Sequence, residues 1–452
     1  MFSMGVSLIT PASSTVAPED TFYPPLDSIS YITGGAGLSF SEKFTAPAEG
    51  PASMVSAAYD YCAMPHPHPD RYQPPLPVQN RSVEAQLVYV EYIQRHQRRT
   101  AYNILPGGED QTYNCDNVHP YLYAEPAAGS PSSIEALAVY AQTYSDPTNP
   151  FIIDFVNGSC QYPQLTLGGI LNGYQHGRDL WAVYGDSMKL LPSSPDTQKA
   201  LPGLSCEGFL PNHREPLPLH QQPPGVDTVN QVISCQARSK LLAKIQSTDA
   251  WKEHLEVTRP LRARLARLFR ANMTEWMSTF DHFADNFQAR LCNGYRLPCS
   301  RSDPLSCVTE DEAEVFRAAD WEWNYWWRQN QNASRYIQLT EGLFLKEIAE
   351  RLKSTSQRTL GRVYTHSFVH DGDLGPVLGA MGIQRLRWPG MGSNMAFEVW
   401  KTNEHQFFVR VLYGGHPLRT VHGDLEWVPL PDIVTQLMVH VPDDIVSMCN
   451  DS

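Results

Sequence analysis

The stretch Ala85-Gln-Leu-Val-Tyr-Val-Glu-Tyr-Ile-Gln94 runs directly into Arg95-His96-Gln97-Arg98-Arg99, and these fifteen residues decide the fold. The first ten are β-branched, aromatic and almost continuously apolar, which is typical of a central strand buried on both faces. The basic residues begin where this strand should end. In open α/β sheets, ligands bind beyond the carboxyl ends of the strands. The sequence therefore predicts a buried strand that carries a basic, histidine-containing turn to the edge of a sheet.

A second strand with a polar site at its end is predicted late in the chain. Residues 362–369 (RVYTHSFV) have strand character, and His370-Asp371 follow them at the start of a helix that should run to about Met381. Asp371 or Asp373 is expected to cap this helix. On the dipeptide alone, a helix cap with a solvated histidine would be the better interpretation. Its position at a strand end instead favours a functional site.

The composition limits the function classes. The chain has 452 residues, of which 42% are hydrophobic and 11% aromatic, as in a globular protein with a packed core. The net charge of −13 argues against general binding of nucleic acid or of anionic membranes, because both need a basic surface. No run of 18 apolar residues occurs, so no membrane-spanning helix is expected.

Changes in composition divide the chain into four predicted segments. Residues 1–80 are rich in Pro, Ser, Ala and Gly and predict an extended N-terminal arm without packed elements. Residues 81–225 and 356–452 predict two parts of one α/β core, and residues 226–355 predict a mainly helical cap or insertion. In the insertion, WEWNYWWRQNQ (321–331) is expected to form a buried aromatic seam and not a carbohydrate or membrane platform.

Cysteines and glycosylation motifs favour a secreted protein or one of the secretory pathway. Nine Cys are scattered without the CxxC spacing of a zinc site, and an odd number leaves at least one outside an internal disulfide. Asn-x-Ser/Thr sequons begin at Asn80, Asn157, Asn272, Asn332 and Asn450. A cytosolic protein with inert thiols is the alternative. The first twenty residues lack a basic start and a long apolar stretch, so no signal peptide is identified.

One group of candidate metal ligands occurs in the N-terminal segment. Cys62, His66 and His68 are close together, but Pro alternates with the histidines and no fourth ligand is near. A solvated loop without a metal is therefore the expectation.

The basic turn has the chemistry of a phosphate site. Neighbouring cations depress the pKa of a histidine, which keeps the imidazole of His96 neutral and able to attack phosphorus. A guanidinium group binds two phosphate oxygens as a planar fork. Arg95 and Arg99 lie four residues apart, so a tight turn or a first helical turn could bring both onto one phosphate.

Taken together, the two motifs resemble those of the histidine acid phosphatases. In that family a first strand leads into Arg-His-Gly-x-Arg-x-Pro, a late strand leads into His-Asp, and a mainly helical domain lies between. QLTLGG (164–169) is also similar to a family segment in which a helix starts, and the resemblance covers about residues 81–452. It implies an α/β fold with a mostly parallel sheet flanked by helices, as in phosphoglycerate mutase, and a mainly helical insertion.

The resemblance also implies a mechanism and its residues. His96 would be the nucleophile that forms a phosphohistidine, and Asp371 would be the proton donor. Arg95, Arg99 and His370 would bind the phosphate of a small phosphorylated substrate, and no cofactor or metal would take part. The phosphate ester and the oligomeric state stay open, and phytate is less attractive for so acidic a chain.

The chain departs from the family pattern in two respects. Gln97 and Ala101 stand where the motif has Gly and Pro, and the larger Gln97 puts the shape of the phosphate pocket in doubt. A third Arg, usual after a middle strand of the family, has no counterpart among residues 190–219, where Lys199 and Arg214 are the only cations and stand in other contexts. Two functions follow: an active acid phosphomonoesterase, or a catalytically impaired relative that binds phosphate esters.

Overall fold

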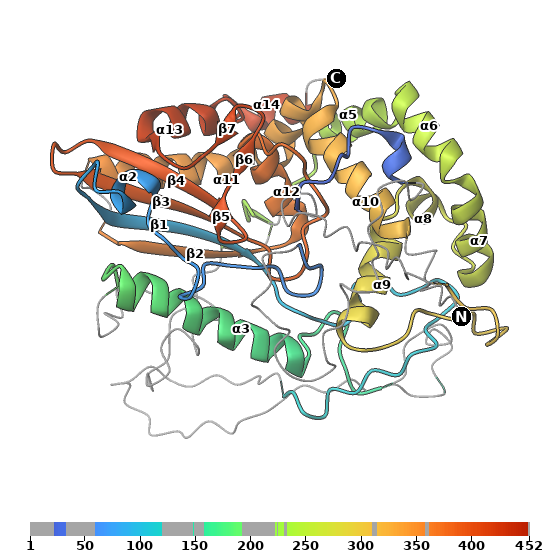
Figure 1. Ribbon diagram of the computed structural model, residues 1–452. Helices are drawn as coiled ribbons and strands as arrows, with labels where there is room; N and C mark the ends of the chain where they lie inside the picture. Colours follow the sequence, from blue (N-terminus) through green and yellow to red (C-terminus); the bar gives the residue numbers. More distant parts are fainter. Residues whose placement is uncertain are drawn as a thin grey trace, which may run out of the picture.

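The computed structural model describes nine parts of the chain: residues 22–32, 59–119, 148, 158–191, 222–223, 225–229, 233–309, 314–357 and 361–450. Among them a sheet lies in the centre with helices on both faces, and a group of helices extends to one side (Figure 1). The α/β class with a helical region is thus confirmed.

The elements before the last third of the chain are mostly helical. They are η1 (Ile29–Tyr31), α2 (Leu76–Gln79), β1 (Ala85–Arg95), α3 (Leu167–Leu180), the π-helix η4 (Trp181–Ser187), α5 (Gln236–Gln246), α6 (Asp249–Val257), α7 (Arg259–Phe269), α8 (Thr274–Ser278), α9 (Asp281–Cys292), α10 (Glu314–Asn324), the π-helix η7 (Tyr325–Gln329) and α11 (Ala333–Ser356).

The last third of the chain supplies most of the strands. It contains β2 (Tyr364–Val369), α12 (Asp371–Ala380), β3 (Asn394–Thr402), β4 (Phe407–Tyr413), the two-residue strands β5 (His416–Pro417), β6 (Arg419–Thr420), β7 (Gly423–Asp424) and β8 (Val428–Pro429), and the helices α13 (Leu430–Met438) and α14 (Ile445–Asn450). Two short helices thus follow the last of these strands.

The described sheet has the order β2-β1-β3-β4-β5, with β8 paired to β4. β1 is parallel to β2 and antiparallel to β3, and β3 is antiparallel to β4. The prediction of a mostly parallel sheet is corrected here, because the sheet is mixed. A short turn over residues 403–406 joins β3 to β4, and a turn of that length forces an antiparallel pair.

Both faces of β1 are buried, as its apolar run predicted. Val90 and Tyr92 face a cluster formed with the end of α3 and the start of η4, which covers one side of the sheet. Tyr89 and Ile93 point to the opposite face and join the main core beneath α11 and α12. The alternation follows the period of two that a strand imposes.

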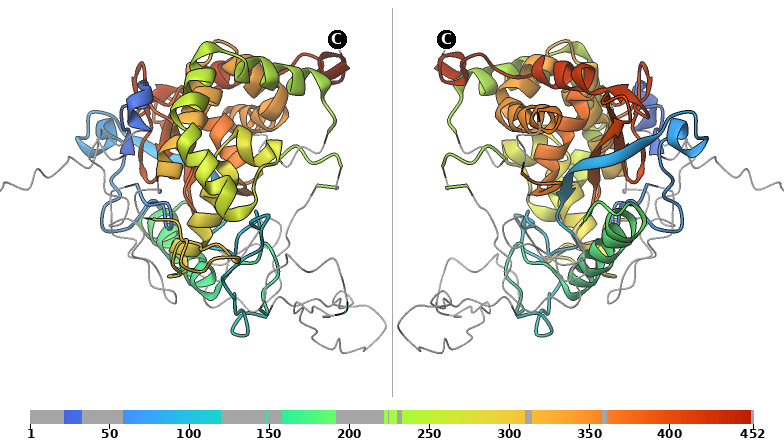
Figure 2. Two further views of the ribbon diagram at one scale, coloured as in Figure 1. Left: turned by 90° about the vertical axis from the view of Figure 1, so that its right-hand side faces the viewer. Right: turned by 90° about the vertical axis from the view of Figure 1, so that its left-hand side faces the viewer.

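The helical region packs its aromatic side chains inward. α5 to α10 stack beside one end of the sheet, which the two side views show clearly (Figure 2). Trp321, Trp323, Trp326 and Trp327 are all buried, and Trp251 of α6 stacks on Trp326 with the ring centroids 5.5 Å apart. The buried aromatic seam predicted for 321–331 is confirmed.

The predicted N-terminal arm is packed wherever the structure describes it. Tyr59, Tyr61 and Met64 belong to the main core, and both tyrosine rings stack against the guanidinium group of Arg387. Asp320 accepts hydrogen bonds from that guanidinium and from Tyr61. The expectation of an unpacked arm was therefore wrong for these residues, since their aromatic side chains outweigh the surrounding prolines. The four-segment division itself stays a prediction.

Four disulfides connect distant parts of the described chain. They are Cys62–Cys292, Cys115–Cys160, Cys235–Cys449 and Cys299–Cys307. The first joins the N-terminal segment to the end of α9 across 230 residues. Cys206, the ninth, lies outside the described residues. None of the described helices is long and apolar enough to cross a membrane.

Candidate active site

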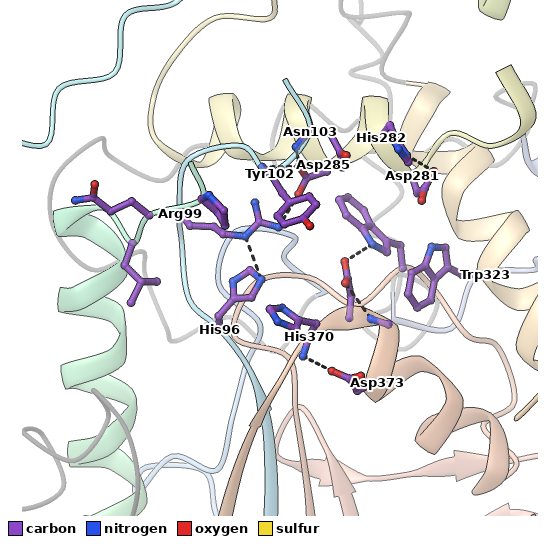
Figure 3. Close-up of a pocket in the computed structure, with 16 residues that line it drawn as sticks. His96, Arg99, Tyr102, Asn103, Asp281, His282, Asp285, Trp323, His370 and Asp373 are labelled. Carbon is purple, nitrogen blue, oxygen red and sulfur yellow. Dashed lines mark hydrogen bonds and ion pairs between the residues drawn. The ribbon is translucent and has the colours of Figure 1, made fainter. Parts of the chain in front are cut away.

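The two predicted motifs meet at one edge of the sheet. β1 and β2 are parallel neighbours in which Arg95 pairs with Val369, so the chain after each strand emerges at the same edge. His96 and His370 therefore face each other with ring centroids 5.6 Å apart (Figure 3). Parallel pairing in this register is what brings together residues that lie 274 positions apart in the sequence.

A pocket of about 650 Å³ opens at this edge. Four of the five predicted site residues line it, and Arg95 lies behind it. The lining residues are His96, Arg99, Tyr102, Asn103, Pro163, Gln164, Leu165, Asp281, His282, Asp285, Trp323, His370, Asp371, Gly372, Asp373 and Trp388.

The helix α12 starts at the pocket. Its N-cap is His370, and the Asp373 side chain accepts a hydrogen bond from the His370 backbone N–H over 2.7 Å. The prediction that Asp371 or Asp373 occupies the N-cap position is corrected, because His370 occupies it. Asp373 contributes to capping from the third helical position, where its side chain binds the backbone N–H of the N-cap residue. The positive end of the helix dipole thus points towards the pocket, where it favours an anion.

His96 is held as a neutral imidazole with one nitrogen free of a proton. Its Nδ1 lies 2.9 Å from the Gln97 carbonyl oxygen, which can only accept, so Nδ1 carries the proton. Burial, assisted by the charges of Arg95 and Arg99, holds the pKa of His96 well below its ordinary 6.5. Nε2 therefore keeps its lone pair at mildly acidic pH, and this lone pair accepts from Arg99 Nε over 3.2 Å.

Arg99 lies across the pocket floor and is fixed at each nitrogen. Its Nη1 donates to the Thr100 carbonyl over 2.9 Å, and its Nη2 forms an ion pair with Asp285 of α9 over 2.7 Å. The other carboxylate oxygen of Asp285 accepts from the backbone N–H groups of Tyr102 and Asn103. The carboxylate thereby ties the Arg99 turn to the helical region.

Arg95 is fully buried beneath the pocket. Its guanidinium lies over the Trp388 ring and donates to the Pro389 carbonyl, and its Nη2 is 2.8 Å from Asp371 Oδ2. Trp388 Nε1 donates to the same carboxylate oxygen over 2.8 Å. Burial raises the pKa of Asp371, but the charges of Arg95 and Arg99 outweigh it and leave that pKa below 3.8. Asp371 is thus a carboxylate in the unliganded site.

Gln97, the residue that departs from the family motif, points away from the pocket. Its side chain is 5% exposed and donates from Nε2 to His176 Nδ1 over 3.1 Å. Gly392, with a φ of +73°, lies so close that a Cβ there would be 2.7 Å from Gln97 Oε1. Gln97 is accommodated because Gly392 leaves room for it, and its side chain does not line the pocket.

The loop that bears His96 is anchored on both sides. Arg98 donates to the Cys292 carbonyl at the end of α9 and to the Asn172 side chain of α3, each over 2.9 Å. Gly169 of α3 packs directly against the Arg98 backbone, where a Cβ would lie 2.0 Å from the carbonyl oxygen. The loop therefore cannot shift without moving α3 and α9.

The histidines of the N-terminal segment are part of this support. His66 was expected in a solvated loop, but it is buried, lies 2.9 Å from Asp179 and stacks on His176 at 3.9 Å between ring centroids. Burial lowers the pKa of His66 and of His176, so both are neutral at physiological pH. The expectation of a solvated loop is corrected, since this segment packs against α3 directly behind Gln97.

Sequence reasoning missed the contribution of α9. Asp281, His282 and Asp285 lie on one helix of the region predicted as a cap, and they complete the side of the pocket that faces the sheet edge (Figure 3). The only sequence signal was the run Asp281-His282-Phe-Ala-Asp285 at a helix start, which is compatible with an ordinary N-terminus. Residues 192–221, which include most of the segment expected to hold a third Arg, lie outside the described residues.

Comparison with known proteins points to a family of phosphatases. The model of the histidine phosphatase superfamily, branch 2, matches residues 217–414, which include His370 and Asp371. Over these residues the chain is similar to that superfamily. Human 2-phosphoxylose phosphatase 1 is 24% identical over 363 residues, covering 73% of this chain and 70% of that protein. The rat protein of the same name is 23% identical over 363 residues, with the same coverage.

The fold of the chain is also similar to that of a solved phosphatase. The structure of Hafnia alvei phytase in its apo form superposes with a TM-score of 0.51 at 12% identity, covering 81% of this chain and 99% of that chain. The likeness confirms the mixed sheet flanked by helices together with its helical region. It says nothing of the substrate, because the sequence identity is low.

Proposed function

We propose that the protein is an acid phosphomonoesterase that forms a phosphohistidine on His96, with Asp371 as the proton donor. The observation that carries the proposal is the arrangement of His96, Arg99 and Asp371 around one pocket. A neutral imidazole with a free lone pair, a fixed guanidinium and a carboxyl group are the parts that transfer of a phosphoryl group to histidine needs.

Phosphate binding would change the contacts of Arg99 first. An anionic phosphate beside the guanidinium competes with His96 for the Arg99 Nε–H, which at 3.2 Å is the longest of the Arg99 contacts to these partners. When Arg99 Nε donates to the phosphate instead of to His96, the lone pair of His96 Nε2 becomes free to attack the phosphorus atom. Asp285 holds the guanidinium in place meanwhile, so that binding orients the ester for attack.

In the first chemical step, His96 Nε2 forms a bond to phosphorus and the bond from phosphorus to the ester oxygen breaks. The ester oxygen leaves with that electron pair and takes a proton from Asp371. Asp371 must therefore become protonated after the substrate binds. The negative charges of the phosphate offset those of Arg95 and Arg99, and the burial that raises the pKa of Asp371 then prevails.

In the second step, water attacks the phosphorus of phosphohistidine. Asp371, now a carboxylate, accepts a proton from the water, the N–P bond breaks, and its electron pair returns to Nε2. Inorganic phosphate leaves, Asp371 releases the accepted proton to solvent, and the starting state with a neutral His96 and an ionised Asp371 is restored. Arg99, His370 and the positive end of α12 offset the charge that develops on the phosphoryl oxygens in both steps, and Arg95 contributes its charge from below.

The protein is further proposed to be a secreted or secretory-pathway glycoprotein. Its four described disulfides favour an oxidising compartment. Among the sequon residues, Asn80 and Asn272 are exposed, as glycosylation requires, and Asn157 lies outside the described residues. The names of the human and rat relatives make a phosphorylated sugar a candidate substrate.

The proposed function is tested by hydrolysis of p-nitrophenyl phosphate at mildly acidic pH. The wild-type protein should turn over this ester, His96→Ala should abolish turnover, and His422→Ala on an exposed turn should retain it. A folded wild-type protein without turnover would instead support the impaired, phosphate-binding relative. Full turnover in His96→Ala would contradict the assignment of the nucleophile.

A further inference from the structure

The pocket extends well beyond the phosphate position, and its far side has a distinct chemistry. Tyr102, Asp281 and His282 form this side, which we call the leaving-group side. Figure 3 shows Asp281 and His282 across the pocket from His96, with Tyr102 between them and the nucleophile. In-line phosphoryl transfer places the leaving group opposite the attacking atom. On the proposed function, the alcohol part of the substrate therefore lies against these three residues.

All three side chains are accessible from the pocket. Tyr102 is 65% exposed although it is a large aromatic residue, and its backbone is held by Asp285. The side chains of Asp281 and His282 are 37% and 28% exposed and form an ion pair of 3.0 Å. This pair outweighs the effect of burial and raises the pKa of His282, which favours an imidazolium beside the Asp281 side chain.

Carboxylates dominate the pocket wall. Asp285 and Asp371 each neutralise one arginine, as the ion pairs with Arg99 and Arg95 show. Asp281 is paired with a histidine, and Asp373 is a fourth carboxyl group of the same wall. Among the described lining residues, Arg99 is the single Arg and there is no Lys. A second phosphate on the leaving group would thus lose hydration without an arginine of its own to bind it.

We propose that the leaving-group side selects a hydroxyl-rich, uncharged alcohol such as a sugar, and rejects substrates with a second phosphate. This inference rests on the proposed function and deepens it. The Asp281 carboxylate accepts hydrogen bonds from hydroxyl groups, the His282 imidazolium donates to them, and the phenol ring of Tyr102 covers the apolar face of a sugar ring. The charges of Asp281 and His282 sum to zero, so this side of the pocket suits a neutral alcohol better than an anion.

A matched pair of substrates tests the proposal. Fructose 6-phosphate and fructose 1,6-bisphosphate differ by one phosphate, and p-nitrophenyl phosphate serves as a reference without hydroxyl groups. The wild-type protein should hydrolyse fructose 6-phosphate with a kcat/KM about tenfold or more above that for the bisphosphate, because the second phosphate loses hydration without gaining an arginine, and about 1.4 kcal/mol of this cost is a factor of ten. Equal or better use of the bisphosphate would overturn the proposal.

Variants of Asp281 assign the preference to this residue. Asp281→Lys should raise the kcat/KM ratio of bisphosphate to monophosphate about tenfold, and Asp281→Asn should raise it less, because Asn only removes the negative charge. Asp249→Lys is the matched control, since Asp249 is also the first residue of a helix but is fully exposed on α6. An Asp281→Asn protein that is folded and has an unchanged ratio would contradict the role of Asp281.

Binding measurements separate this inference from the proposed function. Both fructose phosphates are titrated calorimetrically into His96→Ala, which lacks the nucleophile but keeps the leaving-group side. Tighter binding of the monophosphate, weakened by Asp281→Asn in the same background, supports the inference even if the wild-type protein has no turnover. Tighter binding of the bisphosphate overturns it even if the wild-type protein is an active phosphatase.

Discussion

Arg99 and Asp285 are joined by an ion pair of 2.7 Å that connects the loop after β1 to helix α9. The same carboxylate accepts from the backbone of Tyr102 and Asn103, so it fixes both the guanidinium and the turn that follows it. Arg99, the proposed phosphate-binding arginine, is thus positioned by the helical region, and not by the sheet alone. On the proposed mechanism, the helical region is part of the catalytic unit.

Asp285→Asn should lower kcat/KM for p-nitrophenyl phosphate about a hundredfold, because a guanidinium displaced by about 1 Å no longer orients the phosphate. Asn retains acceptors for the backbone contacts but loses the charge. The measurement is steady-state kinetics with circular dichroism as a check of folding, and Asp249→Asn is the exposed control. A folded variant with wild-type kcat/KM would show that Asp285 does not position Arg99.

Gln97 and Gly392 should be energetically coupled. Gly392→Ala places a methyl group 2.7 Å from Gln97 Oε1 at a φ of +73°, so we expect it to lower the free energy of unfolding by about 1–3 kcal/mol. In the Gln97→Gly background the steric part of this loss should disappear while the backbone strain remains. A double-mutant cycle from denaturant unfolding measures the coupling. Strict additivity would mean that Gly392 is not what accommodates Gln97.

Asp373 should make stability depend on pH. Burial raises the pKa of Asp373 from 3.8 to about 7, so the folded protein holds a proton that the unfolded chain has released. The stabilising contribution is complete below pH 3.8 and is lost as the pH rises through about 7. Asp373→Asn cannot titrate, so its Tm should fall less than that of the wild type between pH 4.5 and 7.5, roughly the window of this titration. Parallel pH profiles of the two Tm values would contradict the raised pKa.

Asp371→Asn should be sensitive to the leaving group. An alkyl alcohol needs a proton in order to leave, whereas p-nitrophenolate leaves without one, so the loss of a proton donor costs more for the alkyl ester. We expect roughly 10²–10⁴-fold lower kcat for an alkyl phosphate and a clearly smaller loss for the aryl phosphate. Equal losses for the two esters would assign Asp371 a role in phosphate binding instead of proton transfer.

Much of this architecture could be predicted from local patterns. The apolar run before Arg95 predicted β1 to within one residue, and the position of His370 after a second strand placed both motifs at one sheet edge. These inferences succeeded because burial on two faces leaves a continuous apolar run, and because ligand sites of α/β sheets lie beyond the carboxyl ends of strands.

The rest depended on contacts between distant segments. The stacking of His66 on His176 and the ion pair between Arg99 and Asp285 each join residues more than 100 positions apart, and no periodicity marks such partners. The prediction of a mostly parallel sheet was wrong for a related reason. A strand pattern reports burial, whereas the pairing of β3 with β4 depends on the short turn between them.

The most direct test of the central claim is to trap the phosphorylated protein. The wild-type protein is mixed with p-nitrophenyl phosphate, denatured rapidly in base, where phosphohistidine survives, and its peptides are examined by mass spectrometry. The mechanism predicts one phosphoryl group on His96, absent from His96→Ala. Turnover of the ester with no phosphoryl group on His96, or with phosphate on another residue, would contradict it.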